Sequence, residues 1–290
     1  MDSGFRVTAL EKTFGAIIDD IDVTALDDAQ FQHVYDLWLE YALLIFPEQN
    51  LTLDEQQKFA RRFGTLVEGL EAIEISNVLS DGTLRTAADD DMMKIIRGNM
   101  AWHQDNTYMP LQAKGAVFSA QQIPRTGGDT AFADMRAAWQ ALPEDQKQRL
   151  SDLCAYHSLV RSQKQLGEET KESDSEYNGY GLDVENIPLR SLMKLHPETQ
   201  QPSLAVGRHA FGIPGLDAAE SETLLDQLID FATADEARVY QHQWRAGDAV
   251  IWDNRCLMHR ACDWNFSEPR VMLHSRIAGD PNSEAALNAA

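Results

Sequence analysis

Residues 239–260, with the sequence VYQHQWRAGDAVIWDNRCLMHR, decide the fold class of this chain. Two short segments rich in β-branched and aromatic residues, 239–244 and 249–252, flank the turn-forming run RAGD at 245–248. Strand segments separated by a short turn that contains Gly are typical of a β-hairpin. We therefore predict a hairpin here, which favours antiparallel β structure.

Short strands dominate the chain on both sides of this segment. A Thr52 to Glu55 capping box predicts where one of the inserted helices begins. Short strands with helices between them suit a mainly β sandwich or jelly roll better than a parallel α/β sheet. We expect further strands at 43–46, 73–78, 115–121, 130–132 and 270–277, and helices at 24–41, 52–62, 135–142, 143–154 and 218–233.

The composition combines an ordinary apolar content with a large excess of acid. At 290 residues, 43% of them hydrophobic, the chain can form one domain, residues 1–290, with a sizeable core. The net charge of −21 repels nucleic acid and anionic membranes, so we expect neither as a partner. The three cysteines lack the paired spacing of a zinc site, and we find no secretory signal and no apolar run of membrane length. We expect a cytoplasmic homo-oligomer that acts on a small molecule.

One long segment, residues 162–186, differs from the rest. Its sequence SQKQLGEETKESDSEYNGYGLDVEN is polar and acidic, and few of its side chains could enter a core. Long irregular segments in compact domains are often functional. The sequence leaves open whether this segment is an active-site lid or a surface loop.

The fragment AWHQD at 101–105 carries the first chemical signal. In an extended segment, residues i and i+2 point to the same side, so His103 and Asp105 can reach one point. One imidazole and one carboxylate supply two ligands of the 2-His-1-carboxylate triad that binds non-haem Fe(II). Such a tripeptide is also common as a solvated polar pair, so it needs a third ligand to carry weight.

A downstream histidine can complete the triad. His259 follows the predicted strand at 249–252, where a sheet folded back on itself could bring it to the His103 segment. Spacing alone does not choose among the histidines, because most histidines in proteins are hydrogen-bonded structural residues. The alternatives that stay open are His33, His157, His196, His209, His242 and His274.

Two further residues could hold an anionic co-substrate beside such a metal. Arg270 opens the last predicted strand, and a guanidinium can grip a carboxylate through a bidentate fork that lysine cannot match. Thr130 opens the predicted 130–132 strand, where its hydroxyl could bond the same carboxylate. Taken singly, a surface ion pair and a capping hydroxyl explain these two residues equally well.

Jointly, these motifs make the chain resemble the taurine and 2,4-dichlorophenoxyacetate dioxygenase family, and most closely the phenoxyacetate branch. Weaker similarity extends from about residue 15 through the 43–46 strand, so nearly the whole chain is covered. The resembling stretches are ISNVLSDG (75–82), WHQD (102–105), GGDTAFADMRAAWQALP (127–143), GDAVIWDNRCLMHRA (247–261) and RVMLHSRIAGD (270–280).

The resemblance implies a double-stranded β-helix, the cupin-like jelly roll, with Fe(II) held by His103, Asp105 and His259. It also implies that Arg270 and Thr130 bind 2-oxoglutarate. The implied reaction consumes O₂, converts 2-oxoglutarate to succinate and CO₂, and hydroxylates a C–H bond of a small, anionic organic substrate. Where the hydroxylated carbon bears an ether oxygen or a sulfonate, the product collapses to phenol or sulfite and a carbonyl compound.

The sequence departs from both named relatives at the position that recognises the substrate anion. The family has an arginine four residues after the 2-oxoglutarate arginine, and this chain has His274, followed by Arg276. The phenoxyacetate branch also has a lysine where this chain has Thr83. A histidine with a pKa near ~6.5 is mostly neutral at about pH 7.5. We therefore expect weaker and more pH-dependent anion recognition than in these relatives.

Asn99 matches a substrate-side asparagine of the taurine enzymes, and with His274 and Arg276 it completes the candidate substrate residues. Two alternatives from other classes remain: a jelly-roll protein that binds a metal or ligand without turnover, and a zinc hydrolase with the same ligands. Neither gives Arg270 and Thr130 a role. Further candidates for the pocket rim, each expected more often at the plain surface, are Lys94, Arg97, Tyr108 and Arg208.

Overall fold

Two β-sheets carry the fold in the computed structural model, which describes residues 4–71, 73–86, 90–167 and 186–289. The large sheet has the strand order β1 (Arg6–Ala9), β2 (Ala16–Asp19), β3 (Leu43–Phe46), β13 (Ala249–Asp253), β5 (Ala113–Gln122), β15 (Val271–Ala278) and β4 (Ile73–Ser76). The small sheet has the order β12 (Val239–His242), β6 (Thr130–Asp134) and β14 (Leu257–Ala261).

The main core lies between these two sheets. It joins Phe118 and Trp252 of the large sheet to Phe132 and Leu257 of the small one, all of them buried. Neighbouring strands pair antiparallel throughout both sheets, except for β2 with β3. This is the predicted mainly β jelly roll with inserted helices.

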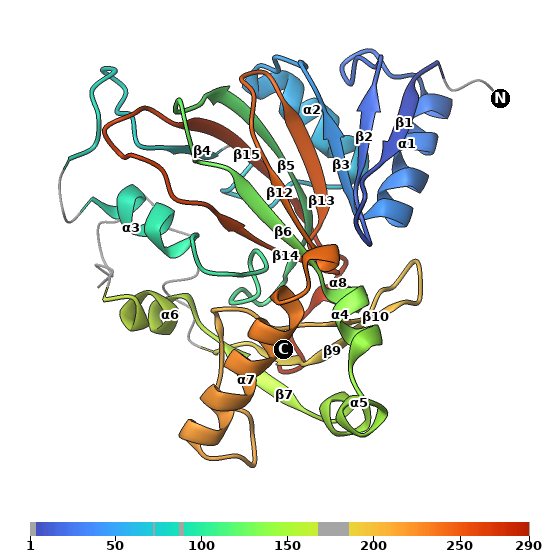
Figure 1. Cartoon of the computed structure of the whole chain (residues 1–290), viewed down its shortest axis with the longest axis vertical. Coiled ribbons are helices and arrows are strands. Elements are labelled where there is room, and N and C mark those ends of the chain that lie inside the picture. The colour runs from blue at the N-terminus through green and yellow to red at the C-terminus, as the bar shows by residue number, and fades with distance from the viewer. Residues whose placement is uncertain (1–3, 72, 87–89, 168–185, 290) are drawn as a thin grey trace.

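The outer face of the large sheet is covered by α1 (Asp28–Tyr41) and α2 (Leu53–Phe63), which lie beside the N-terminal strands in Figure 1. The predicted capping box of α2 is present, with Thr52 and Glu55 each capping the other's backbone. The prediction that α1 begins at residue 24 is wrong, because Asp27 forms its own capping box with Gln30.

A second layer of helices and short strands lies below the sheets in the view of Figure 1. Its first two helices and α7 were predicted, although α5 ends at Ser151 because Cys154 already belongs to a strand. Most of the remaining elements were not predicted. In chain order, the elements from residue 135 onward that lie outside the two sheets are α4 (Met135–Ala141), α5 (Glu144–Ser151), β7 (Cys154–His157), α6 (Leu159–Gln165), β8 (Leu189–Ser191), β9 (Met193–Leu195), β10 (Pro202–Leu204), β11 (Ala210–Phe211), α7 (Ala218–Thr233), η1 (Glu236–Arg238) and α8 (Pro281–Glu284).

The predicted hairpin at 239–252 is wrong. Strand β12 pairs with β6 in the small sheet, whereas β13 pairs with β3 and β5 in the large sheet. The turn around Gly247, which has a φ of +92°, therefore carries the chain from one sheet to the other. A short turn is compatible with a hairpin in one sheet and with a connection between two sheets. The connection between sheets is favoured because it buries both strands in the sandwich.

The predicted polar segment 162–186 is only partly described. Its first residues are the end of α6, where Ser162 and Gln163 are buried, so the prediction of a loop is wrong for 162–165. Residues 168–185 lie outside the described residues, and the choice between lid and loop stays a prediction. None of the described helices is long and apolar enough to cross a bilayer.

Candidate metal and co-substrate site

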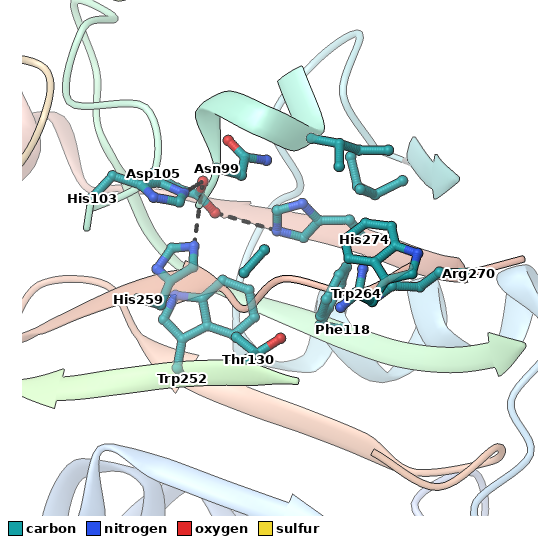
Figure 2. A pocket seen from close by; sticks show the side chains of 13 residues that line it. Asn99, His103, Asp105, Phe118, Thr130, Trp252, His259, Trp264, Arg270 and His274 are labelled. Atoms are coloured by element: carbon teal, nitrogen blue, oxygen red, sulfur yellow. Dashed lines mark ion pairs between the residues drawn. The ribbon is translucent and has the colours of Figure 1, made fainter. Parts of the chain in front are cut away.

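The structure brings His103, Asp105 and His259 together at one end of the sandwich, where Figure 2 shows their side chains converging. One ligand atom from each lies within 4.8 Å of the others, and all three residues are buried. The Nε2 atoms of His103 and His259 lie 3.9 and 3.8 Å from Asp105 Oδ1. Among the described residues, this is the group of His, Cys, Asp and Glu side chains with the geometry to hold a metal ion.

Backbone pairing places the two imidazoles. His103 and His259 form an antiparallel bridge, with each backbone N–H donating to the other's carbonyl at 3.0 and 2.8 Å. The Nδ1 of His103 lies 2.8 Å from the carbonyl oxygen of Ala101, which leaves Nε2 directed at the carboxylate. The pairing joins the 103 segment to β14, so the distant histidine is fixed by sheet register and not by local sequence.

Asn254 places the carboxylate ligand, a role that the sequence did not reveal. Its Oδ1 accepts from the backbone N–H of Asp105 at 2.8 Å, and its Nδ2 donates to the carbonyls of Asp105 and Ala113 at 2.9 and 2.8 Å. The side chain is fully buried. A buried amide that makes all of these bonds fixes the loop tightly, because breaking one would leave an unpaired polar group in the interior.

The protonation states at neutral pH are those that metal binding requires. Burial lowers the pKa of His103 well below its ordinary value, and His259 lowers it further. Burial lowers the pKa of His259 to about 4. Burial raises the pKa of Asp105, but Arg276 and the neighbouring histidines lower it more, so the carboxylate stays ionised.

Arg270 lies in the same cavity with its terminal nitrogens unpaired among the described residues. Its Nε donates to the carbonyl of Gly128 at 2.8 Å, and the guanidinium carbon lies 5.2 Å from the centre of the Trp264 ring. Burial lowers the pKa of Arg270 to about 10. Gly128 has a φ of +71°, and a Cβ there would lie 3.2 Å from Arg270 Nε, so glycine is required beside this arginine.

Thr130 lines the cavity and is held by a tryptophan that the sequence analysis did not single out. The Nε1–H of Trp244 donates to Thr130 Oγ1 at 3.0 Å. Because this bond uses one acceptor site of the hydroxyl, the Thr130 O–H remains able to donate to a carboxylate. Trp244 lies two residues after the end of β12 and closes the predicted strand segment 239–244, and an indole N–H at that position was the available signal.

The predicted substrate residues also converge on the site. His274 Nε2 lies 3.3 Å and Arg276 Nε 3.6 Å from Asp105 Oδ2, the oxygen that faces away from the two histidines. Asn99 lines the cavity at the C-cap of α3 (Asp91–Gly98). The expectation of an ordinary His274 pKa is wrong, because burial and Arg276 lower the pKa to about 4.

Other residues singled out from the sequence lie in different places. Thr83 is exposed in a turn and does not line the cavity. Lys94 and Tyr108 are buried, so the expectation of plain surface positions is wrong for both. The other alternative histidines do not join the metal group, although His209 has its ring 6.0 Å from that of His103.

The remaining wall of the active-site cavity is apolar. Its apolar lining residues are Ile75, Ile96, Phe118, Trp252, Ala261 and Trp264.

Known proteins match the chain over nearly its whole length. A chain of Sphingobium herbicidovorans named (S)-phenoxypropionate/alpha-ketoglutarate-dioxygenase is 57% identical over 288 residues, covering 99% of both chains. A protein of the same name from Delftia acidovorans is 52% identical over 99% of both. The 2,4-dichlorophenoxyacetate dioxygenase of Cupriavidus pinatubonensis is 35% identical, covering 93% of this chain and 96% of its own. A solved structure of AAD-2 in complex with Mn(II) and N-oxalylglycine superposes with a TM-score of 0.87 at 32% identity, covering 98% of this chain and 99% of its own.

The fold, the site and these relatives define an Fe(II)- and 2-oxoglutarate-dependent dioxygenase that acts on a small molecule. Residues 6–276 match the family described as taurine catabolism dioxygenase TauD, TfdA family, and the chain belongs to it. The predicted family, jelly-roll fold, enzyme class and co-substrates are confirmed. The alternatives of a non-catalytic binder and a zinc hydrolase are set aside.

Proposed function

We propose that this enzyme hydroxylates the ether carbon of an (S)-2-aryloxypropionate and so releases a phenol and pyruvate. The observation that carries the proposal is the 57% identity, over 99% of both chains, to an (S)-phenoxypropionate dioxygenase. We assign Fe(II) to His103, Asp105 and His259, and 2-oxoglutarate to Arg270 and Thr130.

The residues at the metal group fit an iron ion. Two neutral imidazoles and one ionised carboxylate are the donor set of a facial triad, which leaves coordination positions for a co-substrate and O₂. When bound, Fe(II) supplies the activation of O₂ that 2-oxoglutarate decarboxylation and C–H hydroxylation require. Arg276 and His274 approach Asp105 Oδ2, so they hold the carboxylate with Oδ1 toward the histidines.

The co-substrate fits the opposite part of the cavity. The unpaired terminal nitrogens of Arg270 offer a planar fork for the distal carboxylate of 2-oxoglutarate, and the Thr130 hydroxyl offers one more donor. The Trp264 ring beside the guanidinium excludes water from this pair. Charge-assisted bonds in such a dry site discriminate strongly for a dicarboxylate.

The chemistry of the substrate follows from the site and the reaction class. Hydroxylation replaces the hydrogen on C2 of 2-phenoxypropionate and gives a hemiketal. In its collapse, the bond between C2 and the aryloxy oxygen breaks. The hydroxyl proton passes to the departing aryloxy oxygen, which gives phenol, and the remaining C2–O bond becomes the ketone of pyruvate. The apolar side chains of Ile75, Ile96 and Phe118 suit the aromatic ring. We assign the carboxylate end to Asn99 and His274, which line the same cavity, and to Arg276, which follows His274 on β15.

Stereochemistry is the sharpest part of this proposal. C2 of the substrate carries a hydrogen, a methyl group, the carboxylate and the aryloxy oxygen. With carboxylate and ring fixed at opposite ends, only one enantiomer presents its hydrogen to the metal, and the other presents its methyl group. A rigid site therefore separates the enantiomers by position and not by affinity alone.

The experiment is a substrate panel with the enzyme loaded anaerobically with Fe(II) and 2-oxoglutarate and then exposed to O₂. We expect succinate and phenol in equal amounts from (S)-2-phenoxypropionate, with less product from the (R)-enantiomer and from phenoxyacetate. Taurine and an alkyl sulfate ester serve as the panel members that release sulfur products. Turnover of a sulfonate or sulfate ester above that of every aryloxyalkanoate would replace the substrate class while leaving the dioxygenase class intact.

The single domain of residues 1–290, the homo-oligomer and the cytoplasmic location stay predictions. So does the absence of nucleic-acid and membrane partners.

A further inference from the structure

A second cavity, of about 190 Å³, lies on the other side of the metal-binding segment. Gln104 and Thr107 line it, whereas His103 and Asp105 line the active-site cavity. We call this second space the rear cavity, and most of its other lining residues come from β7, β8, β9 and residues 283–287. Its mouth lies at the surface, since Leu287, which is 60% exposed, forms part of the rim.

Two cations, Arg190 and Lys194, line the rear cavity, and one buried carboxylate, that of Glu284, lies behind its wall. Lys194 Nζ lies 3.1 Å from Glu284 Oε1, and the Glu284 side chain is only 1% exposed. Arg190 is 7% exposed and has no carboxylate within ion-pair distance among the described residues. Its three nitrogens donate instead to the carbonyls of Thr107, Glu284 and Met109, at 2.7, 2.9 and 2.6 Å.

The two cations together therefore carry one positive charge more than Glu284 balances. Burial lowers the pKa of Arg190 to about 10, so it is still charged at neutral pH. Burying a charge without a counter-ion is costly, and the usual remedy in proteins is a paired anion. This excess is notable in a chain whose net charge is −21.

A histidine without partners points into the same space. His157 lines the rear cavity and is 2% exposed, yet neither of its ring nitrogens has a hydrogen-bond partner among the described residues. Burial and Arg190 lower its pKa to about 3, so the ring is neutral and carries one N–H donor. Buried polar groups are nearly always bonded, so this donor indicates a missing acceptor.

We propose that the rear cavity binds a small monovalent anion between Lys194, Arg190 and His157. The anion would balance the second cation and accept from the His157 ring. A small carboxylate and a halide share this chemistry, and the test below separates them. The inference does not depend on the proposed substrate, because it concerns residues outside the active-site cavity.

The site is connected to the metal-binding segment through Arg190. The bonds of its guanidinium to the carbonyls of Thr107 and Met109 hold the chain just after the ligand Asp105. An anion beside the guanidinium would favour this arrangement by offsetting the cost of burying the charge. We therefore expect anion binding to raise the thermal stability of the folded enzyme by mass action.

The test measures [¹³C]acetate binding by NMR at constant ionic strength. The enzyme is loaded with Zn(II), a diamagnetic ion that the same donor set can hold, and with saturating 2-oxoglutarate, so that the active-site cavity is filled. Two variants change the cavity charge in opposite directions: Lys194→Met removes a cation, and Glu284→Gln removes the competing carboxylate. Lys58→Met is the control, because Lys58 is exposed and also pairs with an aspartate.

We expect wild-type binding, at least about tenfold weaker binding in Lys194→Met and tighter binding in Glu284→Gln, with Lys58→Met unchanged. Chloride that displaces acetate identifies a general monoanion site, and chloride that does not displace it identifies a carboxylate site. Absence of acetate and chloride binding in the wild type overturns the proposal, as does an equal affinity in Lys194→Met and Glu284→Gln. Should Lys194→Met fail to fold, the direction of the change in Glu284→Gln still decides.

Discussion

Each side of the metal-binding segment has a buried arginine without a paired carboxylate among the described residues, and the two arginines form different hydrogen bonds. On the active-site side, Arg270 is a buried cation without a carboxylate within ion-pair distance among the described residues, and its terminal nitrogens face the cavity. On the rear side, Arg190 is also buried and also has no carboxylate within ion-pair distance in the described part of the chain, but its nitrogens all bond backbone carbonyls. The first arrangement suits a ligand gripped by direct hydrogen bonds. The second suits an anion attracted by charge, with a lysine and a histidine as its donors.

This comparison teaches how to find anion sites in an acidic protein. The chain has 46 acidic residues against 25 basic ones, so carboxylates that could pair with an arginine are abundant. A buried arginine that has none therefore marks a position where an external anion completes the charge balance. The predictions below test the two sides, from the largest expected effect to the smallest.

Removing a metal ligand should abolish activity. Asp105→Ala leaves two imidazoles, below the three ligands of the triad, so oxygen-dependent succinate formation should fall to background. The matched control is His157→Ala on the rear side, which should keep its metal and its turnover. Near-wild-type succinate formation by Asp105→Ala would move the metal site elsewhere.

Removing the fork should weaken 2-oxoglutarate binding most. Truncating a buried charge-assisted pair costs roughly 2–5 kcal/mol, so Arg270→Ala should raise the KM for 2-oxoglutarate by more than about tenfold. Arg270→Lys should be nearly as damaging, because an ammonium cannot form two parallel bonds. Initial rates against 2-oxoglutarate concentration check this. An unchanged KM in Arg270→Ala would assign the clamp to another cation, with Arg276 as the first to examine.

Removing the support of Thr130 should have a smaller effect of the same kind. Trp244→Phe keeps the ring but loses the N–H that holds the Thr130 hydroxyl, so we expect the KM for 2-oxoglutarate to rise about two- to tenfold at nearly constant kcat. Trp139→Phe, on α4 away from the site, is the matched control. If kcat fell while KM stayed constant, Trp244 would act on the cavity shape and not through Thr130.

His274 should not titrate in the working range. Its pKa is lowered to about 4, so the ring gains a proton only well below neutral pH and is neutral from pH 6 to 8. We expect wild type and His274→Gln to share one shape of pH profile over this range, measured as kcat/KM for (S)-2-phenoxypropionate. His274→Arg adds the permanent charge that the family resemblance implies at this position, and should improve turnover of phenoxyacetate. A rate that changes between pH 6 and 8 in the wild type and not in His274→Gln would contradict this.

Changing the rear cavity should affect turnover least. Lys194→Met should leave kcat and KM within about twofold of wild type, because Lys194 does not line the active-site cavity. Its thermal stability should lose the acetate-dependent increase that the wild type shows. Steady-state rates and thermal unfolding with and without acetate measure both. A large loss of turnover would mean that the two sides of the segment are coupled more strongly than their separate linings indicate.

Much of the fold was predictable where local sequence and burial agree. The capping box at Thr52 and the apolar run of β3 specify their elements without help from the rest of the chain. The elements between residues 154 and 211 were mostly missed, because strands of two to four residues are too short to show a period. The prediction of a hairpin at 239–252 was wrong for another reason. Its residues are compatible with a hairpin, and only the pairing of β12 with β6 and of β13 with β5 separates them.

The sequence by itself determined the chemistry of this protein. His103 and Asp105 at i and i+2 were enough to predict two ligands of a metal site, because side-chain alternation is a local property of an extended chain. Iron, 2-oxoglutarate and the dioxygenase class were implied by the resemblance of the joint motifs to a known family. Residue spacing left the third histidine open, and the tertiary structure brings His259 beside the pair through its bridge with His103. It also decided the roles of Asn254 and Trp244, the low pKa of His274 and the charge excess at Arg190. Each of these depends on burial or on contacts between residues far apart in the chain, and a local pattern carries no information about either.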